Sequence, residues 1–237
     1  MAIRLGRPLL VALALVLSFA RPALAQTEEP SKNLAPGFTG LPKGAKVALM
    51  PTDMELFSIS GGGVLEPKAD WTEAATRYFH AALAKKRAAL GFDAVDVAEK
   101  DADALADLNA LHGAVAQSIA IHHFGPLQLP TKAGRLDWSM GESVQAIRKT
   151  TGADYALFSW IRDSYASAER KAVMVGLALL GVGIGGGIQT GYASLVDLST
   201  GRVLWFSQLL RVNGDLREAE AAAESLDALL ETFPVAK

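Results

Sequence analysis

Three histidines are the side chains of this chain best suited to bind a metal ion. His112, His122 and His123 fall in a segment whose apolar residues recur every three to four positions, which is the spacing of a helix. Adjacent side chains on a helix point about 100° apart, so His122 and His123 do not face one ion. No acidic residue stands four positions from His122 to complete a two-ligand helix site. The sequence therefore predicts no metal site.

Two glycine-rich stretches have backbone N–H groups that could cradle a phosphate. Gly61-Gly62-Gly63 lacks the Lys and the Ser or Thr of a P-loop, so we interpret it as a flexible turn. Residues 181–186 match the spacing G-x-G-x-x-G. A dinucleotide site also needs a preceding strand, a following helix and an acid about 20 residues on, whereas here a strand follows and residue 206 is phenylalanine. No cofactor is predicted.

Carboxylates are the remaining candidates for catalysis. The chain has no cysteine, no G-x-S-x-G elbow, no H-E-x-x-H and no Walker motif. The acids that could be paired for acid–base work are Asp70, Glu73, Asp154, Asp163 and Asp197. Each has a simpler role as a helix cap, a strand-edge residue or a turn residue. We therefore predict no catalytic residue and expect that the protein is not an enzyme.

The elements that position all these side chains are organised around residues 152–211. Residues 154–162 are mainly apolar at both odd and even positions, as in a strand covered on both faces. Two β-rich runs, 191–198 and 202–211, flank the loop Ser199-Thr200-Gly201, and this pattern predicts a β-hairpin. Between the strand and the hairpin, residues 172–188 carry no charged or strongly polar side chain.

The rest of the chain supplies strands and helices in alternation. Asp70 followed by Glu73 has the form of a capping box, and Gly91 suits the position after a helix. The remaining predicted elements are strands at 46–51 and 92–97, a strand or loop at 56–60, helices at 70–90 and 141–151, a helix from Asp101 or Asp103, a loop at 124–137 and a last helix opened by Gly214-Asp215. Together they predict an α/β fold: a mixed sheet with helices packed on it, ending in a β-hairpin and a C-terminal helix.

The first 25 residues have the three parts of a secretory signal peptide. These are a basic start at Arg4 and Arg7, an apolar core at 9–20, and the small-residue site Ala23-Leu24-Ala25 after Pro22. An uncleaved membrane anchor is the alternative, but the apolar core is short for a span of ~20 residues. We expect a chain secreted across the inner membrane into a bacterial periplasm, with outer-membrane association left open.

The mature chain is expected to be acidic and soluble. Removing Arg4, Arg7 and Arg21 from the 23 Lys and Arg residues leaves 20 against 25 Asp and Glu residues, a net charge of −5. Without a basic tract, this balance argues against nucleic acid as a partner and against charge-driven binding to an anionic membrane. The lack of cysteine excludes disulfides and the acylated cysteine of a lipoprotein. Residues 26–45 are predicted to be a flexible leader, and 46–237 a single α/β domain with an apolar Gly-rich insertion at 170–190.

The order of the elements resembles a known group of envelope proteins. The features that carry the resemblance are Lys46-Val-Ala-Leu-Met-Pro51, Thr151-Gly-Ala-Asp-Tyr155 before a strand, and Asp197-Leu-Ser-Thr-Gly-Arg-Val-Leu-Trp205 at a hairpin. They resemble the CsgG-like and TolB amino-terminal-domain-like proteins, which include outer-membrane accessory lipoproteins, over most of residues 46–233. The resemblance implies an α/β domain, often self-associating, that assists transport or assembly at the envelope. In CsgG-like channels, segments that interrupt the sheet form membrane hairpins.

The apolar insertion is the candidate contact site. Three readings stay open for residues 172–188: a core or sheet-covering segment, a surface for self-association or a partner, and a membrane-inserting element. An exposed apolar patch of this size would be unusual in a monomer. The residues we single out for partner or membrane contact are Val175, Leu177, Leu179, Leu180, Val182 and Ile184. We expect a non-enzymatic periplasmic accessory protein that supports an envelope complex through protein–protein contacts, the alternative being an oligomeric membrane-inserting channel component. A homo-oligomer and a peripheral membrane contact are left open.

Overall fold

The computed structural model describes residues 31–235, so the predicted signal peptide at 1–25 lies outside the described part of the chain. The strands are β1 (Lys46–Leu49), β2 (Asp53–Ile59), β3 (Leu65–Pro67), β4 (Asp93–Asp96), β5 (Tyr155–Ala166), β6 (Gln189–Asp197) and β7 (Val203–Arg211). The helices are α1 (Ala69–Leu90), α2 (Glu99–Ala102), α3 (Ala106–Ile119), α4 (Gln145–Thr151), α5 (Ala168–Ala178) and α6 (Ala219–Leu229). Short helical turns cover Asp103–Leu105, Ala120–Phe124, Pro130–Lys132 and Glu142–Val144.

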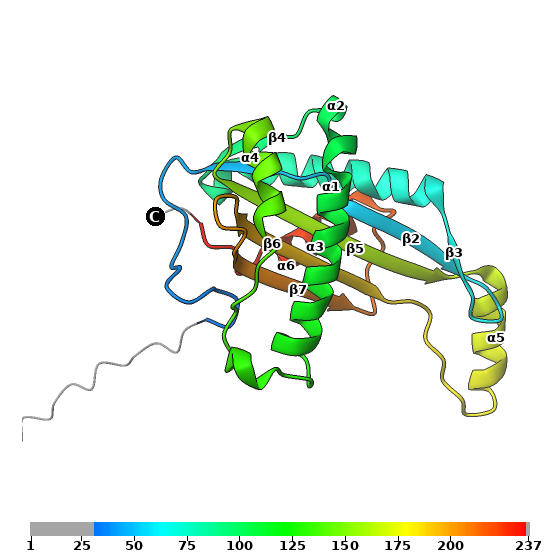
Figure 1. Cartoon of the computed structure of the whole chain (residues 1–237). Coiled ribbons are helices and arrows are strands. Elements are labelled where there is room, and N and C mark those ends of the chain that lie inside the picture. The colour runs from blue at the N-terminus through cyan, green and yellow to red at the C-terminus, as the bar shows by residue number, and fades with distance from the viewer. Residues whose placement is uncertain (1–30, 236–237) are drawn as a thin grey trace, which may run out of the picture.

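Strand β5 is the centre of the seven-stranded sheet that the described residues form. On one side, its first half pairs in parallel with β1 and its second half in parallel with β2, while its other side pairs antiparallel with β6 (Figure 1). β4 extends the sheet from β1, β3 from β2, and β7 from β6. The mixed sheet, the β6–β7 hairpin and the C-terminal helix predicted from the sequence are confirmed.

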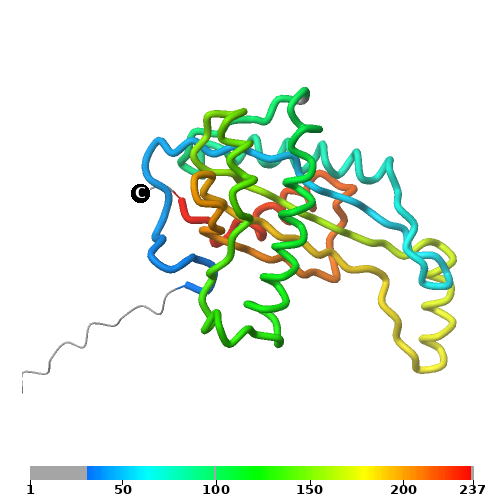
Figure 2. Tube along the Cα trace, in the orientation of Figure 1, coloured from blue at the N-terminus to red at the C-terminus, as the bar shows by residue number. Residues whose placement is uncertain are grey.

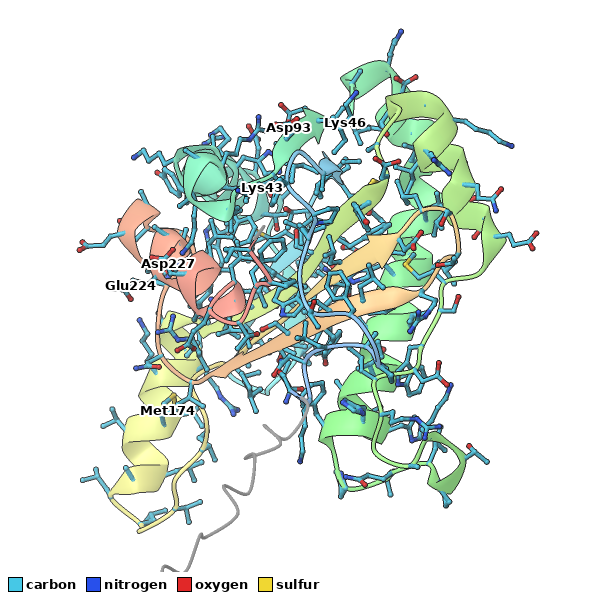
Figure 3. The ribbon with its side chains drawn as sticks, turned by 90° about the vertical axis from the view of Figure 1, so that its left-hand side faces the viewer. Lys43, Lys46, Asp93, Met174, Glu224 and Asp227 are labelled. Atoms are coloured by element: carbon cyan, nitrogen blue, oxygen red, sulfur yellow. The ribbon has the colours of Figure 1, made fainter. Side chains whose placement is uncertain are left out.

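Helices cover both faces of this sheet, which is why β5 is apolar on both sides. Leu157 and Ile161 pack into the cluster beneath α1 and α6. Ala156 and Phe158, at the alternate positions, pack into a second cluster beneath α3 and α4. Figure 3 shows the three layers edge-on, with the α1–α6 layer and the α3–α4 layer on opposite sides of the strands.

The predicted capping box at the start of α1 is wrong. The N-cap residue is Lys68, no side chain caps the helix, and Asp70 lies inside the first turn. Strand β2 sets the start of the helix instead, because the Lys68 N–H donates to the Leu56 carbonyl at 2.8 Å and the Leu56 N–H donates to Thr72 Oγ1 at 2.9 Å. The predicted end is confirmed, since Gly91 adopts φ +73° there.

Residues 31–45, predicted as part of a flexible leader, instead cover the start of β7 (Figure 2). The Ala35 N–H donates to the Leu204 carbonyl at 2.8 Å, and the Phe206 N–H donates to the Asn33 carbonyl at 3.0 Å. Leu41 is 2% exposed, so this segment also contributes to the core. The prolines and glycines of this segment indicated a flexible leader, whereas the segment covers a sheet edge.

Two helix starts also differ from the prediction. The last helix begins at Ala219 rather than at Gly214-Asp215, because Asp215 closes a turn whose Glu218 N–H donates to the Asp215 carbonyl at 2.9 Å. The second helical segment starts as α2 at Glu99 and passes through a turn at Asp103–Leu105 before α3.

Candidate contact site on an exposed arm

The apolar insertion forms an arm, defined as residues 167–188, that projects from the far end of the sheet (Figure 1). Helix α5 is its outgoing leg, and residues 179–188 are its return leg to β6. No residue from Arg170 to Ile188 is buried. Figure 3 labels Met174 on the arm and shows that the arm projects away from the layered body. The reading of this stretch as a core or sheet-covering segment is therefore wrong.

A side-chain cap fixes the start of the outgoing leg, helix α5. Ser167 is the N-cap, and its side chain accepts a hydrogen bond from the Arg170 N–H at 3.1 Å. This cap sets the start of the helix at Ala168, four residues before the uncharged run begins at Ala172. The basic pair Arg170-Lys171 therefore lies on the arm, just before its apolar part.

The base of the arm rests on the turn between β2 and β3. The Ser167 N–H donates to the Ile59 carbonyl at 3.0 Å. A Cβ added at Gly61 would lie 3.4 Å from Glu169 Cβ, and one at Gly63 would lie 3.5 Å from the Arg170 guanidinium. The triple glycine is thus the turn that was predicted, and it lies against the first turn of α5.

The return leg depends on glycine where it rejoins the sheet. Gly187 has φ +150°, and a Cβ there would lie 1.9 Å from the Ser164 carbonyl oxygen, so no other residue fits. Above it, a Cβ at Gly186 would lie 3.2 Å from the Met174 methyl group. The Val182 N–H also donates to the Leu177 carbonyl at 2.9 Å, which joins the two legs.

The predicted contact residues occupy the outer half of the arm, and most are exposed. The exposed fractions are 84% for Leu179, 77% for Leu180, 64% for Val175 and 48% for Val182. Leu177 and Ile184 are half-buried. Beside the base of the arm, Val64 and Leu65 at the β2–β3 turn add 64% and 54% exposed apolar side chains. The arm and this turn form the apolar surface on which a contact function would act.

The solved structures to which the chain is similar are distant ones. The PelC dodecamer from Paraburkholderia phytofirmans has a TM-score of 0.41 and 14% identity, covering 84% of this chain and 94% of that chain. Lipoprotein GNA1162 from Neisseria meningitidis has a TM-score of 0.29 and 12% identity, covering 70% and 79%. The LpoB C-terminal domain from Salmonella enterica has a TM-score of 0.30 and 16% identity, covering 73% and 85%. No protein-family model matches the chain, and neither does any curated protein.

Asp163 lies at the root of the arm and is only 3% exposed. Its carboxylate accepts hydrogen bonds from the Tyr165 hydroxyl at 2.6 Å, the Gln189 amide at 2.8 Å and the Ser164 N–H at 2.7 Å. Burial raises the pKa of Asp163, and the hydrogen bonds oppose that rise. Because Gln189 begins β6, the carboxylate joins the two strands that frame the arm.

The same network reaches α6 and the turn before it. The Ser225 hydroxyl donates to Gln189 Oε1 at 3.0 Å, and the Leu216 N–H donates to the Tyr165 hydroxyl oxygen at 2.7 Å. The Arg217 guanidinium stacks on the Tyr165 ring, 4.1 Å from its centroid. Burial, together with the hydrogen bond to Asp163, raises the pKa of Tyr165, so the phenol stays protonated and donates. The arm therefore leaves the body at a buried, hydrogen-bonded root.

The histidines do not converge. His112 is 1% exposed, and its Nε2 lies 2.9 Å from the Ser194 hydroxyl. The His122 ring lies against the Leu127 carbonyl and the His123 ring against the Lys32 carbonyl. Within residues 31–235, no group of three or more His, Cys, Asp and Glu side chains could hold a metal ion.

The acids singled out from the sequence are also dispersed. Glu73 pairs with Arg77 on α1 at 2.7 Å, and Asp154 pairs with Arg148 at 3.4 Å. Asp197 accepts the Ser199 N–H at 2.7 Å in the hairpin loop, which is the turn role predicted for it. Asp163 has a buried role that the sequence missed. Its signal was a lone acid in a strand that is apolar on both faces.

An open groove of about 490 Å³ lies between β2 and the start of α1. Its charged groups are already paired: Arg162 lies 2.7 Å from Asp53 and 3.5 Å from Glu55. The groove is therefore lined by paired charges, and the exposed apolar side chains of the arm remain the candidate contact site.

Proposed function

We propose that this protein is a non-enzymatic accessory protein of the bacterial envelope that docks on a protein complex through its apolar arm. The single observation that carries the proposal is the exposure of Val175, Leu179, Leu180 and Val182 on a segment held away from the core. Burying one such side chain stabilises by roughly 1.5–3 kcal/mol. Burial of the four side chains therefore favours a contact and offsets part of the entropic cost of association. The export signal predicted at residues 1–25 accounts for the compartment.

The backbone of the return leg favours a protein partner over lipid. Within residues 31–235, no N–H group from Gly183 to Gly187 donates a hydrogen bond. In hydrocarbon each such group costs several kcal/mol, whereas a protein surface can offer acceptors. A docked partner satisfies both the apolar side chains and these donors.

A membrane-inserting component is the second candidate, and one observation favours it. Among the leucines of residues 31–235, Leu179 and Leu180 are the most exposed, and they stand at the tip of the arm, where they would enter a bilayer first. No helix within residues 31–235 combines the length and the apolar character needed to cross a membrane. An arm of this kind would reach the interfacial zone of a bilayer.

The test is a charge introduced at the tip of the arm. We expect the double variant Leu179→Asp, Leu180→Asp to melt like wild type, because both side chains are exposed, and to lose the envelope proteins that wild type captures after in-cell cross-linking. Leu127→Asp is the matched control, since Leu127 is 63% exposed in a loop outside the arm. The control should keep the wild-type partners. An arm variant that retains every partner would refute docking through the arm, and mature protein found only in detergent extracts would favour the membrane candidate.

A further inference from the structure

The outer edge of β7 is covered over about half of its length by a segment near the start of the described residues. Asn33 to Ala35 lie along it opposite Leu204 to Phe206. The Leu34 N–H then donates to the Ser31 carbonyl at 3.0 Å, so the covering segment turns at this point. Beyond Phe206, nothing within residues 31–235 pairs with the outer side of β7.

The uncovered half of this edge has backbone groups ready for pairing. The Phe206 N–H and carbonyl both point outward, because both bond to Asn33, at 3.0 Å and 2.8 Å. Outward and inward groups alternate along an antiparallel strand, so those of Gln208 and Leu210 also point outward. The exposed side chains here are Leu210 at 70% and Val212 at 83%. An open edge with apolar side chains is a template for another strand.

The return leg of the arm has the complementary properties. Residues 182–188 are non-helical, and Gly183 to Gly187 have N–H groups without a partner within residues 31–235. Val182 and Ile188 are 48% and 47% exposed. The return leg carries no charge, and the edge from Val203 to Val212 carries one, on Arg211.

Charge favours a second copy of the chain as the occupant. From Arg170 to Ile188 the arm holds two bases and no acid. With Glu169, the arm has a net charge of +1, so the rest of the mature chain, whose total is −5, has −6. The arm of one copy is thus attracted to the body of another.

We propose that the outer edge of β7 from Gln208 to Arg211, together with Val212 beyond it, accepts the return leg of the arm of a second copy as an added strand. This inference rests on the proposed function, because it names the surface on which the arm docks. Strand addition satisfies backbone groups on both sides and buries Leu210 and Val212. The contact is head-to-tail, so repeated copies build a ring or a filament.

The absence of cysteine makes the contact directly testable by disulfide formation. A Cβ at Gly183 would meet nothing within 4 Å, so Gly183→Cys fits the return leg without strain. Single variants Gly183→Cys and Leu210→Cys are mixed and oxidised, and we expect a heterodimer on a non-reducing gel. The matched control replaces Leu210→Cys by Leu127→Cys, because Leu127 is 63% exposed in a loop outside the arm. Cross-linking to the control in equal yield, or only between two Gly183→Cys arms, would overturn the proposal.

A second pair of variants tests the edge without disulfides. Gln208→Pro removes an outward N–H and Gln208→Lys puts a charge on the edge, and both changes block strand addition at an edge. We expect both variants to be monomeric by sedimentation velocity at concentrations where wild type associates; Gln208→Lys serves if the proline variant does not fold. Wild type that stays monomeric throughout would overturn the proposal.

The experiments distinguish a failure of the strand-acceptor proposal from a failure of the proposed docking function of the arm. If Leu179→Asp, Leu180→Asp loses its envelope partners while no Gly183–Leu210 cross-link forms, the strand acceptor is wrong and docking by the arm stands. If wild type instead floats with phosphatidylethanolamine–phosphatidylglycerol vesicles in an arm-dependent way, without that cross-link, the arm binds lipid and the acceptor is also wrong. If the arm variant keeps all partners, both proposals fail.

Discussion

Strand β5 and the arm that follows it are both apolar, but β5 is packed on both faces and the arm is exposed. Phe158 and Ile161 are fully buried between two helical layers. Leu179 and Leu180, some twenty residues on, are 84% and 77% exposed. Burial therefore depends on what covers a segment rather than on its composition. Strand β5 has neighbouring strands on both sides, whereas the arm rests on one turn at its base.

The difference in burial between β5 and the arm originates at the junction between these two segments. Asp163, Tyr165 and Gln189 form a buried polar network where β5 ends and β6 begins. A buried carboxylate needs these hydrogen bonds, and they fix the positions of both strands. Past the junction, the glycines from Gly181 to Gly187 disfavour any continuation of helix α5. The chain is thus built to hold an apolar segment outside its core.

The largest expected effect on the free energy of unfolding comes from truncating a core side chain of β5. Truncating a side chain of the arm is the matched comparison. Phe158→Ala should lower the free energy of unfolding by about 3–5 kcal/mol, because it leaves a cavity beneath α3. Leu180→Ala should change it by no more than about 0.5 kcal/mol, because Leu180 contacts mainly solvent. Urea denaturation followed by tryptophan fluorescence measures both. Equal losses would mean that the tip of the arm is packed as tightly as the core.

The next expected effect is a loss of folding stability at low pH, which should arise in the core around β5 and not in the apolar part of the arm. His112 is stacked on Phe158, with ring centroids 4.9 Å apart, and burial lowers its pKa to about 3. The unfolded chain binds a proton below about pH 6.5 and the folded chain does not, so the stability that His112 contributes is complete above pH 6.5 and is lost as the pH falls toward 3. Residues 172–188, the apolar part of the arm, contain no ionisable group and add nothing to this loss.

His112→Gln should remove up to one proton from the slope of stability against pH, about 1.4 kcal/mol per pH unit between pH 6.5 and 4. Leu180→Ala is the control and should keep the wild-type slope. Urea midpoints at a series of pH values measure the slope. A slope that is unchanged in His112→Gln would show that another group accounts for acid unfolding.

Much of the body could be predicted from the sequence because its signals are local. The double-faced pattern of β5, the loop Ser199-Thr200-Gly201 and the position of Gly91 each follow from backbone and burial rules that act over a few residues. The capping box failed because Thr72 bonds to Leu56 across the chain. The two residues are 16 positions apart in the sequence, so their contact cannot be recognised from the residue types around either of them.

The candidate site was predicted in residues but not in environment. The composition of 172–188 fits a core segment and an exposed arm equally well, and only the strands on either side decide between them. The open edge of β7 was missed for a similar reason. It exists because Asn33 to Ala35 cover half of a strand 170 residues away in the sequence, from a stretch whose prolines and glycines indicated a tether.

Apart from the control Leu180→Ala, the smallest expected effect on stability comes from removing the arm altogether. Strands β5 and β6 are antiparallel neighbours, with Asp163 opposite Gln189, and the Ala166 N–H donates to the Gly186 carbonyl at 2.7 Å. Replacing residues 167–185 by Asn-Gly therefore joins two strand ends that already lie side by side, through a two-residue turn suited to a hairpin.

The shortened chain should unfold within about 1 kcal/mol of wild type, because a shorter loop gains a little closure entropy and few packed contacts are lost. Its association with a second copy should disappear, since the return leg is cut away. Thermal melting and sedimentation velocity on one preparation measure both quantities. Collapse of the fold would show that the arm stabilises the body from outside it, and the contrast between a covered strand and an uncovered arm would then be wrong.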